Sequence, residues 1–171
     1  MGPNEGVADE LLREHLAFIF RSLRRLGVAQ GLLDDAVQDV FVVALRRGAE
    51  FRGQSSYRTW LFGIAHNVAR EYERKRRRAL TFDVLDDAQR AAGPSPLDQV
   101  TSTEALRFVD EFLRQLSDEK RAVFIMADLE QIPVPEIARA LGANLNTIYS
   151  RLRVSRQEFK TLMQQRFKDE P

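Results

Sequence analysis

A short segment between the second and third expected helices carries side chains that could hold an unstacked nucleotide base. It combines an aromatic ring, a cation, a glycine and three small polar side chains: Phe51, Arg52, Gly53, Gln54, Ser55 and Ser56. Aromatic stacking and hydrogen bonds to base edges are how proteins capture single-stranded bases. A plainer interpretation is a helix N-terminus capped by Ser55 or Ser56. The two interpretations can hold together.

A polar and cationic row follows on the next expected helix. Its members recur at three and four residues: Asn67, Arg70, Arg74 and Arg77. This spacing places them on one side of a helix, opposite the apolar stripe through Trp60, Ile64 and Val68. Such a row suits the phosphates of a nucleic-acid strand. It could equally be an ordinary solvated helix face.

The most specific local pattern in the sequence is that of a helix-turn-helix. Ala138 is the small residue needed inside the first helix, and Gly142 follows four positions later, where the turn needs a positive φ. Ile148 then provides the apolar anchor of the second helix. Pro135 suits the first turn of the first helix, and Asn144 can cap the second. The alternative is an ordinary helical hairpin without a DNA-binding role.

The second helix of this motif would present polar side chains to a DNA duplex. The candidates are Asn146, Thr147, Ser150, Arg151, Arg153 and Arg156. Arginine can reach guanine edges or phosphates, and serine or asparagine can contact either. The sequence leaves open which of these side chains meets a base.

The helix expected at residues 33–47 has an unusual outer face. Four side chains share one side of it: Asp35, Gln38, Asp39 and Val42. An exposed valine among acids indicates a surface that docks another protein, although an acidic surface with a stray valine is the plainer reading. Asp34, Asp35 and Asp39 could also bind a cation, but no complementary ligands stand at suitable spacing elsewhere.

The composition excludes several kinds of site chemistry. The 171 residues contain no cysteine, which removes thiol nucleophiles, disulfides and cysteine-based zinc sites. Of the two histidines, His15 is expected to pack between helices and His66 to be an exposed bystander. We therefore expect no enzyme activity, no catalytic residue, no metal and no cofactor.

Charge and hydropathy indicate the cellular setting. The 26 Lys and Arg nearly balance the 25 Asp and Glu, giving a formal charge of +1, so only the distribution of charge can indicate partners. No apolar run reaches the roughly 18 residues that a membrane span needs. The acidic residues 1–9 do not resemble a signal peptide. We expect a cytoplasmic protein without membrane insertion.

Apolar periodicity predicts an all-α fold, and strand signals are absent. The first expected helix places Leu16, Ile19 and Leu23 on one apolar stripe. The expected helices span residues 8–26, 33–47, 57–78, 104–116, 118–130, 134–141 and 145–166.

Two small helical domains are predicted, residues 1–78 and 104–171, the second carrying the helix-turn-helix. Residues 79–103 would be a flexible linker, because they contain Gly93, Pro94 and Pro96 and lack helical periodicity. The linker is acidic, whereas each domain has a basic surface. This distribution suggests two contact sites on one polyanion.

Taken in order, these motifs resemble those of bacterial RNA polymerase sigma factors of the extracytoplasmic-function (ECF) group. Residues 35–41 resemble the helix with which the family binds the polymerase clamp. The family's −10 promoter region is resembled by residues 51–53, 57–61 and 64–67. Its −35-binding domain is resembled by residues 116–121, 136–138 and 147–152.

The resemblance implies an alternative sigma factor that binds core RNA polymerase, at the clamp of the largest subunit and at the flap. The face around Gln38 and Asp39 would dock on the clamp. The 51–56 loop would capture a flipped base of the −10 strand, with Asn67 helping to read it, and the second domain would read the −35 element as duplex. Helping to melt the −10 region would start transcription. An anti-sigma partner is also implied.

Two other interpretations remain at the level of sequence. A polymerase-independent helix-turn-helix regulator explains residues 104–171, but not the second basic row or the loop at residues 51–56. A structural adaptor, or a storage form held by an inhibitor, is compatible with the exposed helix faces. The latter state can coexist with a sigma factor.

Overall fold

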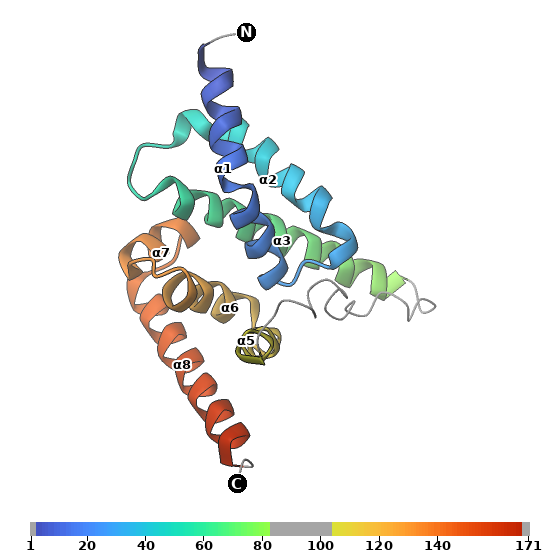
Figure 1. The fold of residues 1–171 in the computed structure, drawn as a ribbon, viewed down its shortest axis with the longest axis vertical. Coiled ribbons are helices and arrows are strands. Elements are labelled where there is room, and N and C mark those ends of the chain that lie inside the picture. Colours follow the sequence, from blue (N-terminus) through green and yellow to red (C-terminus); the bar gives the residue numbers. More distant parts are fainter. Residues whose placement is uncertain (1–2, 83–103, 169–171) are drawn as a thin grey trace. The chain divides into compact units, whose positions relative to one another are not determined.

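The computed structural model describes residues 3–82 and 104–168 and, within them, the side chains of residues 13–81, 104–166 and 168. These residues form helices and the turns between them, with no strand in the described ranges. The chain divides into two compact units, residues 1–100 and 101–171 (Figure 1). The predicted all-α fold of two helical units is thus confirmed. Most of the segment predicted as a linker lies outside the described residues.

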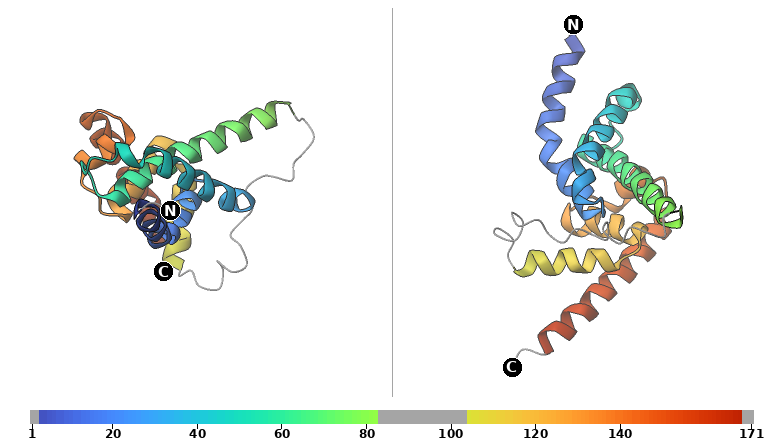
Figure 2. Two further views of the ribbon diagram at one scale, coloured as in Figure 1. Left: turned by 90° about the horizontal axis from the view of Figure 1, so that it is seen from above. Right: turned by 90° about the vertical axis from the view of Figure 1, so that its right-hand side faces the viewer.

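In residues 3–82, the described part of the first unit, three long helices pack against one another in pairs (Figures 1 and 2). They are α1 (Pro3–Arg25), α2 (Leu33–Arg47) and α3 (Tyr57–Phe82). Short 3-10 turns, η1 (Gln30–Leu32) and η2 (Gly48–Glu50), precede and follow α2. The helix predicted at 33–47 is found with those bounds, whereas α3 continues past the expected residue 78.

The core of the first unit differs from the predicted stripes at two positions. Leu16 is 47% exposed, and Phe18 is buried instead, because the buried side of α1 runs through Phe18, Ser22 and Leu23. His66 is only 7% exposed, which corrects the expectation of an exposed bystander. It lies four residues after the buried Phe62, so the helix repeat brings it to the same face.

Residues 104–168, the described part of the second unit, form four helices and a π-helical turn. They are α5 (Glu104–Gln115), α6 (Asp118–Phe124), the turn η4 (Ile125–Leu129), α7 (Val134–Leu141) and α8 (Leu145–Lys168). The helix predicted at 118–130 is therefore found over 118–129, but its second half is π-helical rather than α-helical. The backbone N–H of Glu130 donates to the carbonyl of Ile125, five residues back, at 2.9 Å, which is the π-helical pattern.

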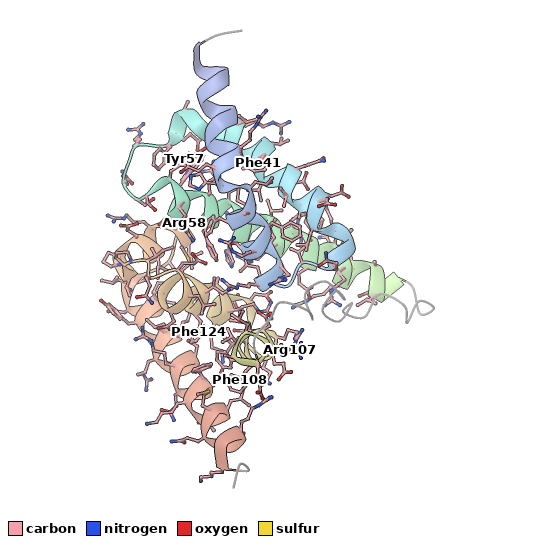
Figure 3. The ribbon with its side chains drawn as sticks, in the orientation of Figure 1. Phe41, Tyr57, Arg58, Arg107, Phe108 and Phe124 are labelled. Carbon is pink, nitrogen blue, oxygen red and sulfur yellow. The ribbon has the colours of Figure 1, made fainter. Side chains whose placement is uncertain are left out.

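Aromatic rings from three helices form the centre of the second unit. Phe112 of α5 lies 5.1 Å from Phe124 of α6 and 5.0 Å from Phe159 of α8, between ring centroids. Phe108 and Phe124 mark this centre in Figure 3. Arg121 of α6 donates from Nε to the carbonyl of Leu113 at 2.7 Å, which satisfies a backbone acceptor near the end of α5. These contacts fix the scaffold on which α7 and α8 are presented.

Candidate nucleic-acid and polymerase interfaces

The helix-turn-helix is formed by α7 and α8, as predicted. Gly142 ends α7 with φ of +60°, a left-handed conformation that a side chain would strain. Ala138 and Ile148 are buried where the two helices meet. The Asn144 carboxamide oxygen accepts a hydrogen bond from the backbone N–H of Asn146 at 2.8 Å, and so caps α8.

The first turns of α8 present a polar surface to solvent. Asn146, Thr147, Ser150 and Arg153 are exposed, whereas Arg151 is half-buried. Sequence reasoning missed Tyr149, which is 52% exposed between these residues. Its spacing was a usable signal, because it lies three residues after Asn146 and four before Arg153 and so shares their face. Arginine, amide, hydroxyl and phenol groups together can read base edges and hold phosphates.

Arg156, further along α8, is already held by another element. Its Nε donates to both carboxylate oxygens of Asp128 at 3.1 Å, and its Nη2 donates to Oδ1 at 2.8 Å. Hydrogen bonding to Asp128 raises the pKa of Arg156, so the guanidinium stays charged. The prediction treated Arg156 as a cation extended toward DNA. In the structure, one edge of it is engaged within the protein.

The loop before α3 is compact and rich in aromatic contacts. Ser56 caps α3, because its Oγ accepts from the backbone N–H of Thr59 at 3.1 Å. The ring of Phe51 lies 5.4 Å from Tyr57 and 5.4 Å from Trp60, between centroids. Figure 3 labels Tyr57 at the start of α3, where partial burial raises its pKa. Phe51 is therefore half-buried against other rings rather than sealed in the interior.

The remaining loop residues face solvent to different extents. Gly53 adopts φ of +69°, so this bend also depends on glycine. Arg52 and Gln54 are exposed, and Ser55 is half-buried. Asn67 is exposed on α3, ten residues beyond Tyr57, which is about 15 Å along the helix axis. Asn67 therefore lies about three helical turns along α3 from the end of the loop.

The cationic row on α3 is less cationic than the sequence suggested. Arg74 forms an ion pair with Glu71, and Nε of Arg77 donates to Glu73 at 2.8 Å, while Arg70 is exposed. Hydrogen bonds from Arg74 and Arg76, in that order, lower the pKa values of Glu71 and Glu73. Because such exposed pairs are weak, a phosphate can replace the glutamates, but the row is not a free strip of positive charge.

The outer face of α2 has the predicted composition. Asp35, Gln38 and Asp39 are exposed, and Val42 is 43% exposed among them. Leu45, which the sequence analysis did not include, adds an exposed apolar side chain three residues on. This face is thus an apolar strip bordered by acids.

Asp39 is tied to α3 by a hydrogen bond. The Tyr72 hydroxyl donates to Oδ2 of Asp39 at 2.7 Å. Partial burial and this bond raise the pKa of Tyr72 to about 12. The outer face of α2 and the arginine-rich end of α3 are therefore linked within the first unit.

Two other site types find no support in the described part of the chain. No three His, Asp or Glu side chains there form a group that could hold a metal ion, so the acids of α2 do not gather into such a site. None of the described helices is both long and apolar enough to cross a bilayer.

Comparison with known proteins identifies the family. The Sigma-70 region 2 family matches residues 11–79, and the Sigma-70 region 4 family matches residues 108–158. RNA polymerase sigma factor YlaC of Bacillus subtilis is 30% identical over 169 residues, covering 93% of this chain and 91% of that protein. The ECF RNA polymerase sigma-E factor of Escherichia coli is 27% identical over 146 residues, covering 80% of this chain and 76% of that protein.

A solved structure has the same fold. The sigma factor RpoE in complex with the anti-sigma factor NepR from Bartonella quintana superposes with a TM-score of 0.74, at 24% identity, covering 91% of this chain and 96% of that chain. The chain belongs to the sigma-70 family of bacterial transcription initiation factors. Within that family it is an alternative sigma factor of the ECF group.

Proposed function

We propose that the protein binds core RNA polymerase, recognises −10 and −35 promoter elements, and starts transcription by helping to melt the −10 region. One observation carries this proposal: a region 2 match and a region 4 match follow each other in one chain, and each coincides with a surface suited to its task. The protein would make no bonds itself. It would direct the polymerase and lower the cost of opening DNA.

Region 2 would supply the polymerase contact and the melted-strand contact. The outer face of α2, with Asp35, Gln38, Asp39 and Val42, fits a partner with apolar and basic groups, for which we propose the clamp of the largest subunit. The 51–56 loop and Asn67 would receive the −10 strand. Flipping a base costs a few kcal/mol, and stacking on an aromatic ring returns about 1–3 kcal/mol. The polymerase would supply the remainder.

Region 4 would read the −35 element as duplex. The exposed side chains at the start of α8 lie within reach of base edges once that helix enters a major groove. Contact with the polymerase flap is proposed for the same unit. In this scheme residues 1–78 and 104–171 are the two working domains, and residues 79–103 join them.

We also propose an anti-sigma partner. The structural neighbour RpoE was solved in complex with the anti-sigma factor NepR. Exposed apolar side chains in the first unit, among them Leu16 and Leu45, would suit cover by a protein of that kind. A cytoplasmic location follows from this scheme, because the polymerase is there.

Run-off transcription with core polymerase on a promoter library tests the proposal. The starts, read by sequencing, should share a −10 and a −35 motif at fixed spacing, and omitting the protein should abolish them. We also expect the protein alone to bind these promoters poorly, because each unit makes few contacts. Nanomolar promoter binding without polymerase, at physiological salt, would instead support a polymerase-independent helix-turn-helix regulator.

A further inference from the structure

The pair of Arg156 and Asp128 joins α8 to the π-helical turn η4. The two side chains meet through the Nε edge of the guanidinium, at 2.8–3.1 Å. A guanidinium has five N–H donors in a rigid plane, and this arrangement uses only one edge. Arg156 remains 56% exposed at its side chain, compared with 27% for Asp128. The carboxylate therefore fixes the plane of the arginine while the arginine stays at the surface.

The backbone around Asp128 is itself held in place. Its carbonyl accepts a hydrogen bond from Nε2 of Gln131 at 2.9 Å. The N–H of Ile132 donates to the carbonyl of Met126, also at 2.9 Å, and Met126 is fully buried. A π-helical turn is rare and often occurs at functional positions. Here it places a carboxylate on a fixed backbone beside α8.

With the start of α8 in a major groove, as proposed above, Arg156 would stand where the helix leaves that groove. It follows Asn146 by ten residues, which is about 15 Å along the helix axis. The major groove is about 8.5 Å deep, so a helix whose first turn touches base edges carries this position to the level of the phosphates. Arg153 and Lys160, three residues before and four after, are exposed on neighbouring turns. The position thus lies in a row of three cations.

We propose that Asp128 is a positioning residue, which orients the Arg156 guanidinium so that its other edge binds a phosphate of the −35 duplex. The inference rests on the proposed −35 function of this unit. If Asp128 acted only through its negative charge, it would repel the DNA phosphates and weaken binding. If it acts by orienting Arg156, it strengthens binding. Removing the carboxylate by a single substitution therefore distinguishes repulsion from orientation.

The test measures holoenzyme binding to a promoter duplex at several salt concentrations, using the full-length protein with core polymerase. Arg156→Ala should weaken binding on the order of three- to tenfold on every −35 sequence, and lower the salt slope by about one. Asp128→Asn should also weaken binding, by about two- to fivefold, although it removes a negative charge. In an Arg156→Ala background, Asp128→Asn should cause no further loss.

A matched control uses a carboxylate of α8 itself, in the same unit as Asp128. Glu158 pairs with Nζ of Lys120 at 2.6 Å, so Glu158→Gln removes the same charge from the same unit without touching Arg156. This variant should bind promoters as the unmodified protein does, or slightly better. Arg156→Lys keeps the charge but loses the bidentate contact with Asp128. Its promoter affinity should lie between those of the unmodified protein and Arg156→Ala. Thermal unfolding of each variant shows whether the fold is kept.

Three results would overturn the inference. Unchanged or tighter binding by Asp128→Asn would mean that the carboxylate only neutralises Arg156. Losses by Asp128→Asn and Arg156→Ala that multiply in the double variant would mean that the two act separately. A lower melting temperature with an unchanged salt slope in Arg156→Ala would mean a purely structural pair. The proposed −35 function fails separately, if Arg153→Ala leaves promoter binding intact.

Discussion

The two long surface helices, α3 and α8, hold their arginines in different ways. On α3 the partners of Arg74 and Arg77 are Glu71 and Glu73, three and four residues away on the same helix. On α8 the partner of Arg156 is Asp128, on a different element. An ion pair within one helix partly neutralises the arginine, but it does not attach the arginine side chain to another part of the fold. A pair between elements also sets the orientation of the arginine relative to a second part of the fold, as Asp128 does for Arg156.

The largest expected effect concerns the anchoring of α8. Ile148→Ala should lower the free energy of unfolding by about 2–5 kcal/mol, because Ile148 is fully buried and truncation leaves a cavity. Denaturant unfolding followed by circular dichroism measures it. Tyr149→Ala, at the exposed neighbouring position, should change stability by less than about 0.5 kcal/mol. Equal effects would mean that α8 is not anchored by Ile148.

The next effect compares the two helices as DNA contacts. Arg153→Ala on α8 should weaken promoter binding by about 1–3 kcal/mol and relax preference at one −35 position, if the side chain meets a base. Arg74→Ala on α3 should weaken binding equally on all sequences and by less, because this arginine exchanges Glu71 for phosphate. Competition binding across a −35 library distinguishes them. A sequence-dependent loss from Arg74→Ala would reverse the assignment.

A third prediction separates the faces of the first unit. Asp39→Arg should weaken association with core polymerase by about tenfold or more, since it reverses the charge of the docking face. Asn67→Ala should leave that association intact and impair selection at the −10 element. Pull-down of core polymerase and a −10 library provide the two readouts. If Asp39→Arg holoenzyme forms normally, the docking face lies elsewhere.

The smallest effect is a pH dependence at the link between α2 and α3. The pKa of Tyr72 is raised to about 12 in the folded protein, from an ordinary value near 10. A group whose folded pKa is raised adds stability that is complete below pH 10 and is lost between about pH 10 and 12. Tyr72→Phe should flatten the decline of stability over that range. An unchanged decline would mean that the bond to Asp39 contributes nothing.

Features set by neighbours along the chain were predictable from the sequence, and features set by tertiary contacts were not. The caps at Ser56 and Asn144 and the turn at Gly142 follow from local backbone needs, and the structure has them. The bond between Tyr72 and Asp39 joins residues 33 positions apart, and no local pattern indicates it.

Two of the misses lie between these extremes. The ion pairs of Arg74 with Glu71 and of Arg77 with Glu73 are predictable, because these residues stand three and four positions apart on one helix. The predicted cationic row does not include the two glutamates. The ion pair between Arg156 and Asp128 could not be predicted, because the position of Asp128 depends on a π-helical turn. Apolar periodicity does not distinguish such a turn from an ordinary α-helix. Charge on a surface helix is thus predictable from sequence only after its own neighbours are counted.

The most direct test of the whole account is promoter-dependent transcription by holoenzyme on four matched templates, with the −10 element, the −35 element, both or neither altered. The account predicts strong initiation only when both elements are intact, and none without the protein. Arg153→Ala should reduce the dependence on the −35 element, and Asn67→Ala should reduce the dependence on the −10 element. Initiation that ignores both elements, or that occurs without this protein, would contradict the account.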